Sequence, residues 1–130
     1  MDQKHILLVE DDAIIIESVV YTLEKVGYVV EHATSGNLGV KTALKSKPDL
    51  IIADLLLPDM NGAEMIAQIR KDPWGKNAKI IVLTNLDEEQ MKTKLSSLSI
   101  LHYLLKVDNS LAKITRVVND ILKETSLKTP

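Results

Sequence analysis

The chain has no cysteine, no long apolar run and no cluster of lysines and arginines among its 130 residues. The absence of cysteine excludes disulfides, zinc–thiolate sites and thiol nucleophiles. Its apolar runs are far shorter than the roughly 20 residues that a membrane-spanning helix needs, and its first residues lack the apolar stretch of a signal peptide. A net charge of −2 without a basic run argues against nucleic-acid binding. We therefore expect a cytoplasmic protein that binds neither membrane nor nucleic acid.

Short apolar runs alternate with longer amphipathic segments along the chain. The apolar runs predict five strands, at residues 5–9, 28–31, 50–53, 80–83 and 101–105. Apolar positions three and four residues apart, together with capping residues, predict five helices, at residues 12–26, at 35–45, beyond the loop 57–62, beyond Asp87 and from Ser110. Nearly half of the residues are apolar, so one domain of this length can bury a core. We expect that domain at residues 1–124, followed by a frayed tail at 125–130.

This alternation predicts an α/β fold with a doubly wound, five-stranded parallel sheet. Strands that are apolar throughout are buried on both faces, which requires helices on both sides of the sheet. Right-handed crossovers leave few topologies, and we expect the strand order 2-1-3-4-5. Ligands in such sheets bind at the carboxyl ends of the strands, close to the point between the first and third strands where the winding reverses. Functional residues are therefore expected at the strand ends.

Acidic residues follow two of the predicted strands. Glu10, Asp11 and Asp12 come directly after the first strand, and Asp54 comes after the third. Carboxylates this close repel one another or raise one another's pKa, and a hard divalent cation relieves the repulsion. Mg²⁺ prefers oxygen ligands and keeps several waters. We expect Mg²⁺ (or Mn²⁺) to bind Asp11 and Asp54 directly and Glu10 through a water.

Two further polar residues end the fourth and fifth predicted strands, Thr84 and Lys106. A carboxylate beside an open metal position can attack a phosphoryl group. The transferred group spreads negative charge over three oxygens, so the site mainly positions it and stabilises that charge. The metal can cover one oxygen, the Lys106 ammonium a second and the Thr84 hydroxyl the third. The residues therefore predict phosphoryl transfer to Asp54.

Five segments resemble, in order and separation, those of bacterial response-regulator receiver domains of the chemotaxis-regulator type. They are ILLVEDD (6–12), PDLIIAD (48–54), LPDMNG (57–62), IIVLT (80–84) and YLLK (103–106). The resemblance covers residues 4–124 and is specific because all five segments occur together. It implies the flavodoxin-like fold of two-component signalling proteins. It also implies that Asp54 is the phosphoacceptor for a histidine of a sensor kinase or of a histidine phosphotransfer protein.

The resemblance assigns further roles by position. The backbone carbonyl of Leu56 is the third protein ligand of the metal, and Thr84 and Lys106 bind the phosphoryl group. Tyr103 is the switch aromatic, which rotates inward when Thr84 moves toward the phosphate. A downstream protein then reads the face made by the fourth helix, the fifth strand and the fifth helix. Such a domain is a monomer or a phosphorylation-dependent homodimer, and it is no enzyme beyond its own phosphorylation and dephosphorylation.

Several positions depart from the usual family pattern. Val107 follows Lys106, where the family usually has proline after a cis peptide bond. Asn85 replaces a small residue after the switch threonine and is expected to crowd access to the phosphoacceptor. Leu56 and Leu86 stand two residues past the phosphoacceptor and the threonine, at positions that influence attack by water. Because both are apolar and cannot orient a water, we predict a long-lived phosphorylated state.

Other functions compete with a stand-alone switch that signals by protein contact. One alternative is a receiver excised from a larger regulator or from a hybrid kinase. Val107 and Asn85 motivate a receiver-like interaction module that is never phosphorylated. An aspartyl phosphatase is disfavoured, because such enzymes place their nucleophile after the first strand. A flavin site is also disfavoured, because three acids follow the first strand where a phosphate needs free backbone donors.

Overall fold

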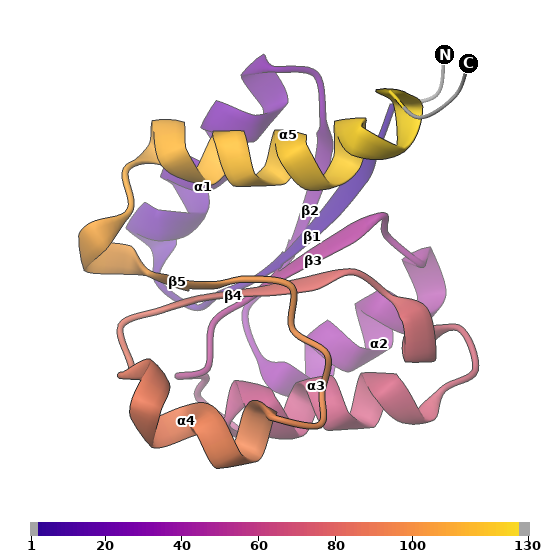
Figure 1. The fold of residues 1–130 in the computed structure, drawn as a ribbon, viewed down its shortest axis with the longest axis vertical. Coiled ribbons are helices and arrows are strands. Elements are labelled where there is room, and N and C mark those ends of the chain that lie inside the picture. The colour runs from indigo at the N-terminus through magenta and orange to yellow at the C-terminus, as the bar shows by residue number, and fades with distance from the viewer. Residues whose placement is uncertain (1–2, 128–130) are drawn as a thin grey trace.

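A five-stranded parallel sheet lies at the centre of the molecule (Figure 1). The structure, a computed structural model, describes residues 3–127, with side chains described through residue 123. The strands are β1 (His5–Val9), β2 (Val29–Ala33), β3 (Leu50–Ala53), β4 (Ile80–Thr84) and β5 (Tyr103–Leu105). Their order in the sheet is β2-β1-β3-β4-β5, which confirms the predicted doubly wound topology.

Helices cover both faces of the sheet. On one face lie α1 (Ala13–Lys25) and α5 (Leu111–Leu127), and on the other α2 (Gly36–Ser46), α3 (Gly62–Lys71) and α4 (Glu88–Leu95). Short 3₁₀ turns at Gly75–Asn77 and Lys106–Asp108 complete the described elements. Alternate residues of β1 enter the two cores, with Leu7 and Val9 toward α2–α4 and Ile6 and Leu8 toward α1 and α5. This two-sided burial explains why the strand is apolar throughout.

Three strands differ from the prediction in their bounds: β2 begins one residue later and ends two residues later, β4 ends one residue later, at Thr84, and β5 begins two residues later. The second strand continues to Ala33, because Ala33 pairs with Val9 at the end of β1. The last strand is shorter than predicted: its paired register begins at Tyr103, opposite Val82, although the backbones of Leu101 and His102 still bond to β4 at 2.9 Å. The last helix runs through Leu127, so residues 125–127 of the predicted tail are helical, and residues 128–130 lie outside the described part. Within residues 3–127, no helix combines the length and apolar composition that a bilayer crossing needs.

Side chains at the strand ends start the helices. Asp12 accepts from the N–H groups of Ile14 and Ile15 at the start of α1, at 2.9 and 3.3 Å. Ser35 accepts from Leu38 at the start of α2, as the sequence predicts. These acceptors satisfy backbone donors that have no partner within the helix. The helices α1 and α2 therefore begin within four residues of the ends of β1 and β2, which keeps these two connections short.

Arg70 at the end of α3 fixes the segment that leads into β5. Its guanidinium donates to the carbonyls of Ala78 at 2.6 Å, Gly75 at 2.8 Å, Leu98 at 2.9 Å and Ser99 at 3.1 Å. Ser99 adopts a left-handed conformation with φ 57°. The planar fork of donors matches several carbonyls at once, so one side chain holds two loops together.

We expect Arg70→Lys to lower the free energy of unfolding by about 1–3 kcal/mol, because an ammonium cannot reach all four carbonyls. Urea denaturation followed by circular dichroism measures the change. The matched control is Arg116→Lys on the exposed surface of α5, for which we expect a change within about 0.5 kcal/mol. Equal effects of the two substitutions would contradict the role of Arg70.

Candidate functional site

Three buried polar side chains lie at the carboxyl edge of the sheet, on residues that end or directly follow strands. Glu10 and Asp54 are only 1% and 3% exposed, and Thr84 is fully buried. The Nζ atom of Lys106 lies 2.7 Å from Glu10 Oε1 and 2.9 Å from Asp54 Oδ2. Residues that end β1, β3 and β5 are thus joined through one ammonium group, at the place where the sheet topology directs ligands.

The acidic side chains form a cluster that fits a hard cation. Glu10, Asp11 and Asp54 each offer one carboxylate oxygen, and these oxygens lie within 4.8 Å of one another. Oxygen donors of this kind are the ligands that Mg²⁺ prefers. Both oxygens of Glu10 already have protein partners, because Oε1 contacts Lys106 and Oε2 accepts from Asp12 N–H at 3.0 Å. This arrangement favours indirect contact between Glu10 and a metal, through a water.

Burial and ion pairing raise the pKa of both Glu10 and Lys106, but for different reasons. Burial raises the pKa of Glu10, and the hydrogen bonds from Lys106 and from the Asp12 backbone offset only part of this rise. Burial would lower the pKa of Lys106, but its hydrogen bonds to Glu10 and Asp54 outweigh burial and raise that pKa above its usual value. Lys106 therefore stays charged at neutral pH and neutralises part of the negative charge around it.

Asp54 is held by its own loop and by the start of α3. Its Oδ1 accepts from Leu56 N–H at 3.1 Å, and its backbone N–H donates to Val9 O at 3.0 Å. Gly62, the first residue of α3, passes so close that a Cβ there would lie 2.2 Å from the Asp54 carbonyl oxygen. Only glycine permits this approach. The Leu56 side chain is 55% exposed, and the metal-binding role of its carbonyl stays a prediction.

The loop beyond Asp54 is also anchored to α2. Asp59 accepts from Gly36 N–H at 2.7 Å and from Asn37 N–H at 2.9 Å. These backbone hydrogen bonds lower the pKa of Asp59. Asp59 thus caps a helix that lies more than twenty residues earlier in the chain, a role that no local sequence pattern indicates. It limits the movement of the loop that carries Leu56.

A chain of hydrogen bonds connects Thr84 with Tyr103. Thr84 Oγ1 accepts from Leu86 N–H at 3.4 Å, and the Tyr103 hydroxyl donates to Leu86 O at 2.7 Å. The Leu86 side chain is half-buried and packs against the core on the side of α2–α4. Leu86 therefore links the threonine to the aromatic through its backbone, while its side chain belongs to the core.

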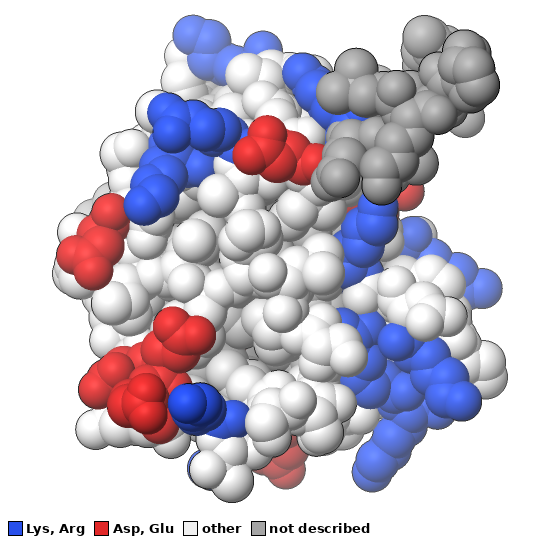
Figure 2. All heavy atoms as spheres, in the orientation of Figure 1, with Lys and Arg blue, Asp and Glu red and all other residues white. Residues whose placement is uncertain are grey.

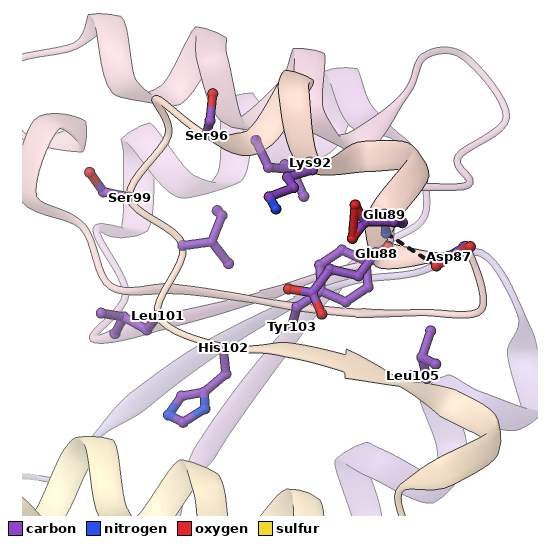
Figure 3. Close-up of a pocket in the computed structure, with 12 residues that line it drawn as sticks. Asp87, Glu88, Glu89, Lys92, Ser96, Ser99, Leu101, His102, Tyr103 and Leu105 are labelled. Atoms are coloured by element: carbon purple, nitrogen blue, oxygen red, sulfur yellow. Dashed lines mark hydrogen bonds between the residues drawn. The ribbon is translucent and has the colours of Figure 1, made fainter.

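Tyr103 borders a groove of about 950 Å³ between α4 and β5 (Figure 3). Glu88 and Glu89 line the groove from the start of α4, while Leu101 and Leu105 line it on the side of β5. Figure 2 shows acidic side chains gathered over the start of α4, beside largely uncharged surface. Tyr103 is therefore in contact both with this groove and with the loop that follows Thr84.

We expect Tyr103 to ionise with a pKa of about 12, because burial raises its pKa and the charges of Glu88, Asp87 and Asp54 add to the rise. Since the unfolded tyrosine ionises near 10, this group's contribution to stability is complete below about pH 10 and is lost as the pH rises through about 12. Titrations at 295 nm of the native chain and of Tyr103→Phe measure the pKa by difference. A difference curve with its midpoint near 10 would show that the hydroxyl is not enclosed.

Asn85 and Val107, two separate departures from the usual family pattern, contact each other. Asn85 Oδ1 accepts from Val107 N–H at 3.1 Å, and both side chains are exposed. No peptide bond within residues 3–127 is cis, so the Lys106–Val107 bond is trans. Neither position alone indicates this contact, because it depends on the approach of the loops after β4 and β5.

Exposed apolar side chains follow three of the strand ends that form the site. Ile14 and Val107 are each 76% exposed, and Leu56 is 55% exposed. They lie within a few residues of Asp11, Lys106 and Asp54 along the chain. The loops that carry the polar site therefore also expose apolar side chains. The sequence alone does not mark Ile14 as part of this surface, because an apolar residue at that position is ordinary in the first turn of a helix.

Comparisons with known proteins agree with this geometry. Residues 6–119 match the family described as "Response regulator receiver domain". The chain is 37% identical over 90 residues to the chemotaxis protein CheY of Thermotoga maritima, covering 68% of this chain and 72% of that protein. It is 34% identical over 127 residues to the alkaline phosphatase synthesis transcriptional regulatory protein PhoP of Bacillus subtilis, covering 98% of this chain and 52% of that protein.

Solved structures show the same fold. The chemotaxis response regulator CheY4 of Vibrio cholerae superposes with a TM-score of 0.85 at 26% identity, covering 93% of this chain and all of that one. The receiver domain of the sensor histidine kinase PA1611 of Pseudomonas aeruginosa, which holds a magnesium ion in its active-site cleft, gives a TM-score of 0.81 at 26% identity. It covers 91% of this chain and 96% of that one.

The chain belongs to the response-regulator receiver domain family of two-component signalling, and its flavodoxin-like fold is the one the sequence predicts. It spans about half the length of several curated relatives that it matches, including 52% of PhoP and 56% of the probable transcriptional regulatory protein SilR of Salmonella typhimurium. Activities of those longer proteins therefore do not pass directly to this chain.

Proposed function

We propose that this domain is a phosphorylation-controlled switch in which Asp54 accepts a phosphoryl group from a histidine of a sensor kinase or a phosphotransfer protein. The observation that carries the proposal is the buried Asp54 carboxylate, paired with Lys106 beside two further acids. We place the switch in the cytoplasm and expect it to catalyse no reaction other than its own phosphorylation and dephosphorylation.

Phosphoryl transfer needs a nucleophile and stabilisation of charge. A carboxylate oxygen of Asp54 attacks phosphorus, the bond from phosphorus to the donor's imidazole nitrogen breaks, and its electron pair stays on that nitrogen. The Lys106 ammonium, 2.9 Å from Asp54, is placed to bind one phosphoryl oxygen, and the Thr84 hydroxyl to bind another. When bound by Asp11 and Asp54, Mg²⁺ (or Mn²⁺) supplies positive charge to the phosphoryl group.

Phosphorylation would reach the groove between α4 and β5 through Thr84. A Thr84 hydroxyl drawn toward the phosphoryl group moves the loop that contains Leu86. The Leu86 carbonyl is the acceptor for the Tyr103 hydroxyl, so its movement changes the position of the ring beside the groove. A downstream protein that binds the face of α4, β5 and α5 would detect this change, and binding would favour the phosphorylated state by the difference in affinity.

A protein phosphodonor fits the surroundings of the site. Asp54 is almost completely buried, so the donor's histidine must approach closely and its surface must cover the mouth of the site. The exposed Ile14, Leu56 and Val107 offer apolar contact area for that surface.

The alternative function is a receiver-like module that is never phosphorylated, which Val107 and Asn85 motivate. Because Lys106 is paired with Asp54 although Val107 follows it, the structure favours the phosphoacceptor function over this alternative.

Incubation with acetyl phosphate and Mg²⁺ should add one phosphoryl group, about 80 Da, to the native chain. We expect no gain for Asp54→Ala, because the nucleophile is absent, and none in excess EDTA, because the cation is absent. Intact-mass spectrometry measures both. Asp120→Asn is the matched control, since it removes an exposed carboxylate of α5 and should gain the same mass. A native chain that never gains the group would favour the unphosphorylated module.

The phosphorylated state should outlast seconds by a wide margin, because the apolar Leu56 beside Asp54 cannot orient a water. Leu56→Asn should shorten the half-life several-fold by placing a carboxamide at this exposed position. Loss of the added mass after removal of the donor gives the half-life. The control is Leu101→Asn, an equally polar change at an exposed leucine beside β5. A native half-life of seconds would contradict the prediction.

A further inference from the structure

One hydrogen bond joins the loops after β4 and β5 at the exposed side of the site. Asn85 directly follows Thr84, and Val107 directly follows Lys106. The 3.1 Å bond from Val107 N–H to Asn85 Oδ1 therefore ties together the backbone segments that carry the hydroxyl and the ammonium of the site. Proline at 107 would have no N–H to donate, and alanine or glycine at 85 would have no side-chain acceptor. The two departures of this chain from the family pattern are thus one interaction.

The Lys106 backbone needs a hydrogen-bond restraint of this kind, because it directly follows the short edge strand β5. The strand β5 is three residues long at the edge of the sheet and ends at Leu105. The Val107 side chain is 76% exposed, so packing does little to hold the backbone beyond the strand. Asn109 bonds to Leu105 O at 2.7 Å and holds the other side of the turn. The bond from Asn85 restrains the residue next to Lys106 itself.

We propose that Asn85 is a positioning residue for phosphoryl transfer, because its bond to Val107 holds the Lys106 backbone where the ammonium faces Asp54. This inference rests on the proposed function. It differs from the sequence-based expectation that Asn85 crowds the approach to Asp54. Steric crowding slows phosphorylation through the bulk of the side chain, whereas positioning speeds it through the acceptor oxygen. The two roles therefore predict opposite effects when the side chain is removed.

The test compares initial rates of mass gain with acetyl phosphate and Mg²⁺ for the native chain, Asn85→Ala and Asn85→Leu. Positioning predicts that both variants react about three- to tenfold more slowly, since both lack the acceptor and one exposed hydrogen bond has effects of this size. Crowding predicts that Asn85→Ala reacts faster and that Asn85→Leu, with similar bulk, is unchanged. Asn77→Ala, an exposed asparagine in the Gly75–Asn77 turn, is the control and should react like the native chain.

Two further measurements separate positioning from a general loss of structure. The Val107 amide should exchange with solvent faster in Asn85→Ala and Asn85→Leu, as observed by NMR. Asn85→Asp, which keeps an acceptor oxygen, should retain its protection. Mg²⁺ affinity, measured by calorimetry, should change less than about twofold, because the acidic ligands are untouched. A larger change would mean that the substitution disturbs the metal site, and would overturn positioning through Lys106.

The outcomes distinguish this inference from the proposed function. If the native chain gains no phosphoryl group, the proposed function fails and the inference fails with it. If the native chain gains the group while Asn85→Ala reacts at the native rate or faster, the inference alone is overturned. Slower reaction of both variants, with a faster-exchanging Val107 amide and unchanged Mg²⁺ affinity, supports it.

Discussion

The ammonium of Lys106 between the carboxylates of Glu10 and Asp54 is the interaction on which the site depends. Two acids buried to this degree repel each other, and removing a shared counter-charge from such a group is costly. Lys106 follows β5 and Asp54 follows β3, and β4 lies between these strands. The long side chain of Lys106 therefore spans the end of β4 to reach Asp54. The buried Thr84 ends β4, the strand between those two, so all three residues follow or end neighbouring strands at the same edge of the sheet.

The loops around the site are held by hydrogen bonds rather than by burial. Asp12 caps α1 beside the acidic cluster, Asp59 caps α2 from the loop beyond Asp54, and Asn85 connects with Val107. A site that must stabilise a developing charge benefits from groups that are already in place. The hydrogen bonds of Leu86 with Thr84 and Tyr103 differ from these, because the Thr84 hydroxyl is expected to bind the phosphoryl group. Phosphorylation would therefore rearrange them.

The sequence predicted the sheet order and the meeting of acids with Lys106, because parallel strands buried on both faces place their carboxyl ends at one edge. It placed the last strand two residues too early, since the regular register with β4 begins only at Tyr103, although Leu101 and His102 already bond to β4 through their backbones. The clamp made by Arg70 and the cap made by Asp59 gave no sequence signal, because both act on backbone atoms whose positions depend on the fold.

The sequence by itself determined the architecture and the chemical groups of the site, because apolar periodicity and strand-end residues are properties of neighbouring positions along the chain. Only the tertiary structure decided how those groups are held. The contacts of Asn85 with Val107 and of Tyr103 with Leu86 join loops that follow β4 and β5. Hydrogen bonds act over about 3 Å, so such pairs exist only after packing has set the distance between the loops.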